Sequence, residues 1–593
     1  MRAPALVSLA VGILLVLPTF TSAQAPSISQ GATQPGPQAP RMTMPPRDGS
    51  VPNAPTGTAR IRGRVVAADT GAPLRRAQVR VMSPEVRAGR SVTTDADGRF
   101  EVTDLPAGRY SLTVGRNGYV SLQFGQQRPF EPGRPLELAN GQLIERVDFS
   151  LPRGSVISGR ITDELGEPMA GVQMQAMRHR YLPTGERQLI PANIGGMFSM
   201  VTNDLGEFRV FGLMPGTYVL SANPDDGGMM SMAGGVMPGN PAGGDSDGYV
   251  TTYYPGTLSA EQAQPINVGV ADVASVSFAL STARMTRISG VVRNSQGRPI
   301  GGARLMIRSR TPAGGFMRGL PPIGPDGQFS IANVPPGEYS LEVSPMAFGG
   351  ANAGPESDEV ASIPVTAAGR DITDLIITTT PGATITGRVI YEGASQAERP
   401  ARVTVQSPEP GSGMMFRPTG DNGVIDATGR FQLRSVTGRA LFRTMYMSAP
   451  SIGWGLKSVT LNGADITDTP LDVASLGDVS GIEITLTDTL SMLSGSVTNA
   501  QRAPVKDYVV VILPDRLREG ALPQRFTRAI RPDQDGRYQT RGLPAGDYLA
   551  VALSALEAGD EWDPAFRKQI EPIAKRFRLM DGQTATVDLQ LVR

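Results

Sequence analysis

Two adjacent aromatic residues, Tyr253 and Tyr254, could form a platform on which a ligand stacks, and Tyr181 and Trp454 are further candidates. The adjacent tyrosines precede a Pro-Gly turn, and Tyr181 follows Arg180, which can donate hydrogen bonds. A flat aromatic face beside charged hydrogen-bonding side chains suits a sugar ring, which has apolar faces and hydroxyl edges. The competing interpretation is that these rings pack long loops onto the body of the protein. The sequence favours packing and leaves sugar binding open.

Thiol and zinc chemistry have few residues available, and no catalytic carboxylate pair can be selected among the 55 Asp and Glu residues. The sequence has no Cys and a single His, His179, which lies between two arginines. Zinc peptidases need several ligands, usually including His residues at fixed spacing, so this function is excluded. Gly244-Asp245-Ser246-Asp247-Gly248 has the spacing of a hydrolase nucleophile, but the His precedes the serine. That motif works only between a strand and a helix, so we interpret the segment as a loop and predict no catalytic residue.

Two other patterns could bind metals. Asp95-Ala96-Asp97-Gly98 and Asp533-Gln534-Asp535-Gly536 place carboxylates at alternate positions. They are much shorter than the roughly twelve-residue calcium loop, and hairpin turns favour the same residues, so we interpret both as turns. A methionine cluster could hold Cu(I) through thioethers, although no His or Cys lies near it: Met229, Met230, Met232 and Met237. The sequence therefore predicts no cofactor and no metal, with copper binding left open.

Composition limits the function classes. The chain has 593 residues, a net charge of +1, 70 Gly and 50 Pro. A near-neutral chain is poorly suited to nucleic acid or an anionic membrane surface as its main partner. Without Cys, it has no disulfides. The many Gly and Pro residues, with no collagen-like period, indicate an all-β chain with many turns.

The N-terminus has the pattern of an export signal. Arg2 precedes an apolar run over residues 5–20, and Thr21-Ser22-Ala23 offers small residues for cleavage. We predict a signal peptide over residues 1–23 and a disordered linker, rich in Pro, Gln, Ala and Ser, over residues 24–58. No later segment is long and apolar enough to cross a bilayer, so we expect the protein in the periplasm or outside the cell.

One phrase recurs along the rest of the chain. In its first copy a turn leads into a strand at Phe100, and Leu105-Pro106-Ala107-Gly108 leads into a second strand at Tyr110. Pro-x-Gly reverses a chain tightly, and apolar residues at every second position mark strands with one buried face. The same pair, ten residues apart, returns as Phe208/Tyr218, Phe329/Tyr339 and Tyr538/Tyr548, and in worn form as Phe431/Leu441. Such a recurrence indicates an array of one structural unit.

Each copy lies between an opening strand of pattern x-Gly-x-Val and a closing strand. About seven short strands per unit, with regular turn signals, indicate an antiparallel β-sandwich. We therefore predict an all-β fold, a tandem array of five Ig-like sandwiches whose short linkers stack them end to end. We name them repeats 1 to 5: residues 59–152, 153–281 (with inserts), 282–379, 380–488 (divergent) and 489–593. Repeat 5 should contain one short helix, around Asp563 to Phe577, with Phe566, Ile570 and Ile573 on one face.

These motifs together resemble the carboxypeptidase regulatory-like domain, a transthyretin-like (prealbumin-like) sandwich found beside the catalytic domain of some zinc carboxypeptidases. The resemblance rests on x-Gly-x-Val, the Gly-x-Pro turn, Asp-x-Gly-x-Phe and Leu-Pro-x-Gly-x-Tyr, and it covers nearly all of residues 59–593. Repeat 4 departs from it, because it lacks Pro-x-Gly-x-Tyr. The long form looks like secreted repeat proteins of soil bacteria. In related folds the sandwich binds starch-like glycans or forms adhesin stalks, and the family name implies no peptidase activity.

The sequence thus predicts an exported, non-catalytic protein of the cell envelope. Polysaccharide is the favoured partner, and the alternative is a structural stalk or a scaffold that docks an envelope protein. Repeat 2 is the expected binding unit, because inserts near residues 181–200 and 223–249 place long loops on a rigid scaffold.

Overall fold

The computed structural model divides the chain into residues 1–53 and 54–593, and every residue that it describes lies in the second unit. The predicted signal peptide (residues 1–23) and nearly all of the predicted linker (24–58) lie outside the described residues. The described ranges are 57–83, 90–192, 200–224, 247–311, 317–319, 323–344, 359–408, 422–446 and 453–592. Within these ranges, no helix has the length and apolar character needed to cross a membrane.

Repeat 1 shows the plan that the other repeats follow. Its opening strand β1 pairs antiparallel with β4 and parallel with the closing strands β8 and β9. A second sheet has the order β3-β2-β5-β6, with β7 also on β5. The strands are β1 (Ala59–Ala67), β2 (Gln78–Met82), β3 (Arg90–Thr93), β4 (Arg99–Leu105), β5 (Gly108–Gly115), β6 (Leu122–Gln123), β7 (Leu136–Leu138), β8 (Leu143–Ile144) and β9 (Phe149–Leu151).

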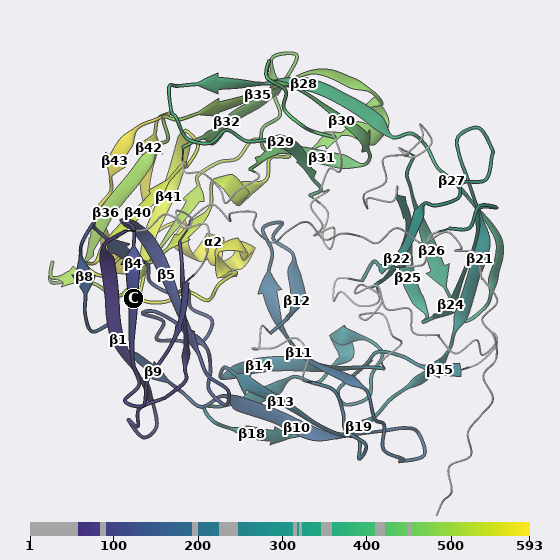
Figure 1. The fold of residues 1–593 in the computed structure, drawn as a ribbon, viewed down its shortest axis with the longest axis horizontal. Coiled ribbons are helices and arrows are strands. Elements are labelled where there is room, and N and C mark those ends of the chain that lie inside the picture. The colour runs from purple at the N-terminus through teal and green to yellow at the C-terminus, as the bar shows by residue number, and fades with distance from the viewer. Residues whose placement is uncertain are drawn as a thin grey trace, which may run out of the picture. The chain divides into compact units, whose positions relative to one another are not determined.

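Repeats 2 and 3 keep this plan, and the two layers of repeat 3 are visible in Figure 1 as β21, β24 and β27 against β22, β25 and β26. Repeat 2 contains β10 (Ser155–Thr162), β11 (Gln173–Tyr181), β12 (Arg187–Pro191), β13 (Glu207–Leu213), β14 (Gly216–Asn223), β15 (Asp247–Tyr249), β16 (Thr252–Tyr253), the 3-10 helix η2 (Ala260–Gln262), β17 (Ile266–Val268), β18 (Val273–Ser275) and β19 (Phe278–Ala279). Repeat 3 contains β20 (Thr282–Arg284), β21 (Thr286–Arg293), β22 (Arg304–Ser309), β23 (Met317–Gly319), β24 (Gln328–Val334), β25 (Gly337–Ser344), β26 (Ala361–Ala367) and β27 (Ile372–Thr378).

Repeats 4 and 5 contain the α-helices of the described chain. Repeat 4 contains β28 (Ala383–Glu392), β29 (Arg402–Gln406), β30 (Arg430–Val436), β31 (Arg439–Met445), β32 (Gly455–Leu461), β33 (Ala464–Asp465), β34 (Leu471–Asp472), α1 (Val473–Leu476) and β35 (Val479–Thr487). Repeat 5 contains β36 (Met492–Thr498), β37 (Pro504–Val505), β38 (Val509–Pro514), the 3-10 helix η4 (Pro523–Arg525), β39 (Arg528–Ile530), β40 (Arg537–Arg541), β41 (Gly546–Leu553), the 3-10 helix η5 (Asp560–Trp562), α2 (Pro564–Ile570), β42 (Lys575–Leu579), β43 (Thr584–Thr586) and β44 (Leu589–Val592).

The glycine of the opening strand has a packing reason. A Cβ at Gly159 would lie 1.6 Å from the carbonyl oxygen of Val276, where the chain passes from one closing strand to the next. The equivalent Gly63 would meet the carbonyl of Val147 at 2.0 Å. Because real Cβ atoms do not approach backbone this closely, only glycine lets the closing strand cross here. The x-Gly-x-Val pattern thus marks where the opening and closing strands touch.

The tyrosine of the recurring phrase is a buried anchor. Tyr110 and Tyr218 lie in the cores of their sandwiches and are 1% exposed. Each hydroxyl donates back to a carbonyl four residues earlier, at 2.8 Å to Pro106 and 2.7 Å to Met214, and repeats 3 and 5 do the same. This bond fixes the Pro-x-Gly turn to the strand that follows it.

Repeat 4 corrects one prediction. Leu441 was expected at the tyrosine position, but Ala440 and Phe442 belong to the core cluster and Leu441 does not. The chain is one residue shorter here. The left-handed residue Ser435 (φ 60°) stands five positions before Ala440, whereas Asp104 (φ 57°) stands six before Tyr110. The shorter turn moves the whole strand by one residue, so alternate side chains change faces.

The buried hydrophobic side chains of the described residues form five larger clusters, each within one predicted repeat. The all-β class and the sandwich architecture are confirmed by the sheets of the described residues. The sheets are not purely antiparallel, however, because each opening strand pairs parallel with the end of its repeat. The division into five domains at the stated boundaries stays a prediction.

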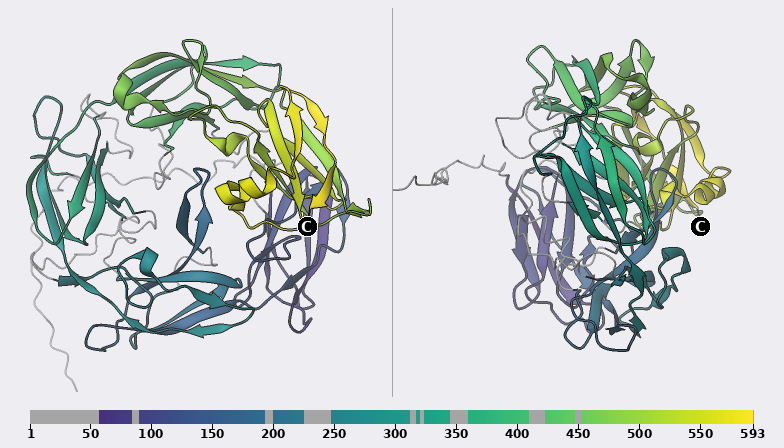
Figure 2. Two further views of the ribbon diagram at one scale, coloured as in Figure 1. Left: turned by 180° about the vertical axis from the view of Figure 1, so that it is seen from behind. Right: turned by 90° about the vertical axis from the view of Figure 1, so that its right-hand side faces the viewer.

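The predicted helix of repeat 5 is shorter than expected. Helix α2 spans Pro564–Ile570, and Asp563 caps it by accepting a hydrogen bond from the amide of Ala565 at 2.8 Å. Ile570 is buried, but Ile573 is exposed. Phe577 belongs to β42, because residues 575–579 pair with β41. As expected, the helix lies against its own sandwich (Figures 1 and 2).

Candidate functional site

Two of the four predicted aromatic residues are buried. Tyr253, on β16, is 7% exposed and packs with Met177, Leu189 and Val219. Trp454 is 5% exposed in the core of repeat 4, where its indole Nε1 donates to the carbonyl of Ala397 at 3.3 Å. Neither residue presents an open ring face on which a sugar could stack. Their contacts match the packing interpretation.

The other two are half-buried. The ring of Tyr254 meets Phe278 edge-on at 5.8 Å between centroids and packs against the repeat 2 core. Tyr181 ends β11, whose hairpin with β12 extends beyond the rest of its sandwich (Figure 2). Tyr254 directly follows β16, and β14 stands between β11 and β16, so the two rings are not on neighbouring strands. Tyr253 is buried beside Tyr254, and sugar binding by Tyr254 or Tyr181 stays a prediction.

The remaining sequence candidates have ordinary structural surroundings. His179 is an exposed residue on β11, as expected. The carboxylate of Asp95 accepts hydrogen bonds from the amides of Asp97 and Arg99 at 2.9 and 2.8 Å, and Asp533 repeats this pattern. These acids close turns. Residues 225–246, which hold Met229 to Met237 and Ser246, lie outside the described residues. In the described part, no three His, Cys, Asp or Glu side chains are grouped to hold a metal.

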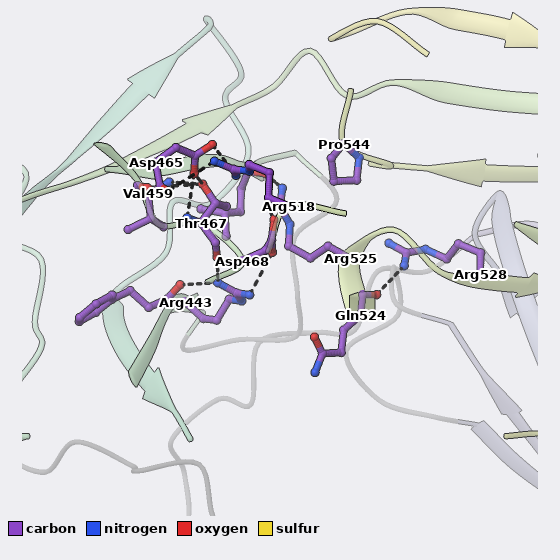
Figure 3. A network of polar contacts seen from close by, with 12 residues as sticks. Arg443, Val459, Asp465, Thr467, Asp468, Arg518, Gln524, Arg525, Arg528 and Pro544 are labelled. Carbon is purple, nitrogen blue, oxygen red and sulfur yellow. Dashed lines mark hydrogen bonds and ion pairs between the residues drawn. The ribbon is translucent and has the colours of Figure 1, made fainter. Parts of the chain in front are cut away.

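The polar sites that the sequence analysis missed lie where one repeat meets another. Figure 3 shows the first, between repeats 4 and 5, around the buried Asp468. Its carboxylate accepts from Arg525 of repeat 5 at 2.9 Å and from Arg443 of repeat 4 at 3.4 Å. Burial raises the pKa of Asp468, and the two guanidinium groups oppose that rise. One acid thus binds a cation from each of two sandwiches.

Further contacts close the same junction. Arg525 donates to the carbonyl of Leu456 at 2.6 Å, and the amide of Leu522 donates to the carbonyl of Asp468 at 2.8 Å. Lys457 of repeat 4 lies 2.7 Å from Glu392 in its own repeat and 3.3 Å from Asp581 of repeat 5. Backbone and side-chain bonds together restrict rotation about the short linker.

A second buried pair joins repeats 1 and 5. The guanidinium of Arg531 contacts the carboxylate of Glu131, 400 positions away in the sequence. Arg531 also donates to Asp507 at 2.7 Å and to the carbonyl of Gly125 at 3.1 Å. Both side chains of the central pair are almost inaccessible, at 1% and 3% exposure. A buried charge of this kind is costly unless it is paired, so the two repeats must stay together for the pair to form.

Hydrogen bonds beside this pair imitate strand pairing. The side-chain amide of Gln534 accepts from the backbone amide of Glu137 and donates to its carbonyl, both at 3.1 Å. Arg134 donates to the carbonyl of Asp533 at 2.7 Å, and Arg109 donates to that of Gln539 at 3.1 Å. Direct contact between the first and fifth repeats corrects the expectation of purely end-to-end stacking. The residues involved carry no spacing pattern that would reveal it.

Repeat 2 meets the same loop of repeat 1 through Phe130. The guanidinium carbon of Arg178 lies 3.6 Å from the centre of the Phe130 ring, and Tyr218 meets that ring edge-on. Arg178 also lies 3.5 Å from Glu557 of repeat 5, while Ala558 donates its amide to the carbonyl of Phe130 at 3.1 Å. The loop around Phe130 therefore contacts both other repeats.

Comparisons with known proteins give one matching family and several solved structures of low similarity. Residues 60–152 and 287–373 match the carboxypeptidase regulatory-like domain. No curated protein matches the sequence. Similar solved structures include the TIE protein of Bacillus anthracis (12% identity, 55% of this chain, 51% of that one, TM-score 0.14). A streptococcal ancillary pilin (11%, 54% and 98%, TM-score 0.19) and the minor pilin GBS52 of Streptococcus agalactiae (11%, 38% and 97%, TM-score 0.19) are also similar. The chain spans about half of the Bacillus anthracis protein, and at these TM-scores the likeness supports no functional argument.

Proposed function

We propose that this chain, which carries carboxypeptidase regulatory-like domains at residues 60–152 and 287–373, is a non-catalytic scaffold protein. It holds several β-sandwiches in fixed positions and presents them to a protein partner. The N-terminal pattern of Arg2, an apolar run and Thr21-Ser22-Ala23 supports export to the cell envelope or the exterior.

The observation that carries this proposal is the buried carboxylate of Asp468 between an arginine of repeat 4 and one of repeat 5. In a stalk whose domains rotate freely, charged side chains at the linkers can stay in water. They then cost no desolvation free energy. Burying Asp468 is favourable only when both arginines are in place. The junction therefore specifies one arrangement of its two sandwiches, which is what a scaffold with a composite surface requires.

Polysaccharide binding, the leading prediction from sequence, has no comparable support. Tyr253 and Trp454 are in cores, and Tyr254 packs on Phe278. We therefore place protein docking ahead of it, and make glycan binding an outcome of the test.

The test compares three full-length variants with the wild-type protein in crosslinking to an envelope extract. Asp468→Asn removes the junction charge, Asp547→Asn removes the exposed partner of Arg578 at 3.9 Å, and Tyr254→Ala removes a candidate sugar contact. We expect a stoichiometric protein complex that Asp468→Asn weakens and the other two leave unchanged. Circular dichroism checks that each variant is folded. Saturable binding to a purified polysaccharide that only Tyr254→Ala abolishes would overturn the proposal in favour of glycan binding.

A further inference from the structure

A cavity of about 310 Å³ lies between repeats 1 and 5 and is lined by four arginines. Arg109 and Arg134 come from repeat 1, and Arg528 and Arg531 come from repeat 5. The other lining residues are neutral, and they include the hydrogen-bonding side chains of Gln123, Gln539 and Thr540. No Asp or Glu lines the cavity. Four positively charged side chains therefore line a single cavity.

Two of these cations lack an acidic partner. Arg531 is paired with Glu131 and Asp507, and Arg109 lies 3.6 Å from Glu137. Arg134 and Arg528, in contrast, have no carboxylate of a described residue within 4.0 Å, and they donate hydrogen bonds to backbone carbonyls. Burial lowers the pKa of both guanidinium groups, and in Arg134 the charge of Arg531 adds to this effect. Half-buried cations without a counter-charge are costly, so an anion bound beside them would be favourable.

An unused donor gives a second, independent indication. Arg531 is 3% exposed, yet its Nε is buried and has no hydrogen-bond partner among the described residues. Buried donors are nearly always paired in folded proteins, with protein, water or ligand. Arg531 lines the cavity, so this unpaired donor belongs to a side chain of the cavity wall.

We propose that this cavity binds a compact, multiply charged oxyanion of the carboxylate or phosphate class. Guanidinium groups present planar pairs of donors that match carboxylate and phosphate oxygens, and such charge-assisted bonds are the strong ones. Arg134 and Arg528 belong to different repeats, so one anion bound to both bridges repeats 1 and 5. This site does not depend on the proposed protein docking. A bound anion would hold repeats 1 and 5 together more tightly.

Arg528→Gln is the decisive variant. Arg528 bonds only to the carbonyls of Gln524 and Thr527 within repeat 5, so its loss removes a cavity charge without breaking a bond across the junction. Arg64→Gln is the matched control, because Arg64 also donates to a backbone carbonyl, that of Asp97 at 2.9 Å, but is outside the cavity. Both variants are made in the full chain, and the amide exchange of Glu137 reports whether the junction stays closed.

Calorimetric titrations with citrate and with inorganic phosphate are the measurement. We expect one site per chain for at least one probe, unchanged by Arg64→Gln and weakened about tenfold or more by Arg528→Gln, the effect of one charge-assisted bond. A polygalacturonate arm shows whether a polymer-borne carboxylate also enters, which separates free small acids from anionic chains as the source. If neither citrate nor phosphate binds, or if both variants weaken binding equally, the proposal is wrong.

Discussion

At the residue scale, each residue of the recurring motif has its own structural role. The glycine of the opening strand gives room for a carbonyl of the closing strand, and the tyrosine fixes a turn through its hydroxyl. Asp95, the acid before the Asp-Gly turn, accepts hydrogen bonds from two backbone amides. None of these roles needs a ligand, so the motif that dominates the sequence is a folding motif.

Gly159→Ala should destabilise repeat 2 by about 3 kcal/mol, because a Cβ there would overlap the carbonyl oxygen of Val276 and neither backbone can easily move. Ser158→Ala, one residue earlier in the same strand, should change the stability by less than about 1 kcal/mol. Hydrogen exchange of strand β14 in the full chain measures both. Equal effects of the two substitutions would contradict the close-approach explanation.

The hydroxyl of Tyr218 should ionise at a higher pH than that of an exposed tyrosine. Burial raises its pKa to about 12, although the charge of Arg178 favours the ionised form. In the unfolded chain a tyrosine has a pKa of about 10. The raised value means that stability from Tyr218 is fully present below pH about 10 and is lost as the pH rises through about 12. The phenolate absorbance of wild type minus Tyr218→Phe should therefore titrate near 12, and a difference titrating near 10 would disprove the assignment.

At the scale of elements, the sequence predicted strands well because period-two alternation and turn residues are local signals. The parallel pairing of opening and closing strands was missed, because alternation identifies a strand but not its partner or direction. The helix of repeat 5 was extended too far, because Phe577 continued the apolar spacing while belonging to β42. Leu441 was assigned to the tyrosine position by its ten-residue spacing from Phe431. The turn before it is one residue shorter, and the sequence alone does not show this.

Helix α2 should depend on its cap. It has only seven residues, and the carboxylate of Asp563 accepts from the amide of Ala565 at 2.8 Å. Asp563→Ala should lower the local stability of residues 564–570 by about 1 kcal/mol, while Asp563→Asn, which can still accept that bond, should cost a few tenths. Exchange rates of the helix amides provide the measurement. Similar losses in both variants would show that charge, and not capping, stabilises this end.

At the scale of the whole described chain, the most informative contacts are those that the sequence could not predict. In the sequence, Arg531 and Glu131 have nothing that distinguishes them from other charged residues. They become a buried ion pair only when repeats 1 and 5 have folded and lie against each other. The burial of Trp454 could not be read from the sequence either, since an aromatic residue looks equally suited to a core and to a ligand. Only tertiary burial separates the two cases.

The Arg531–Glu131 pair should therefore behave as a coupled unit. Arg531→Met leaves Glu131 buried with only the amides of Gln127 and Arg128 as donors, and it should cost about 3–5 kcal/mol of junction stability. Glu131→Gln should cost less, because Arg531 keeps Asp507. The double variant removes both charges, so its cost should be clearly smaller than the sum of the single costs.

The amide of Glu137, which donates to Gln534 across this junction, is the reporter for all three variants. Its hydrogen exchange should accelerate most in Arg531→Met and recover in part in the double variant. The amide of Leu341 in β25 of repeat 3 is the control, and its exchange should not change. If the single effects simply add, Arg531 and Glu131 do not depend on each other. Repeats 1 and 5 would then be joined by the backbone-directed bonds of Gln534, Arg134 and Arg109 alone.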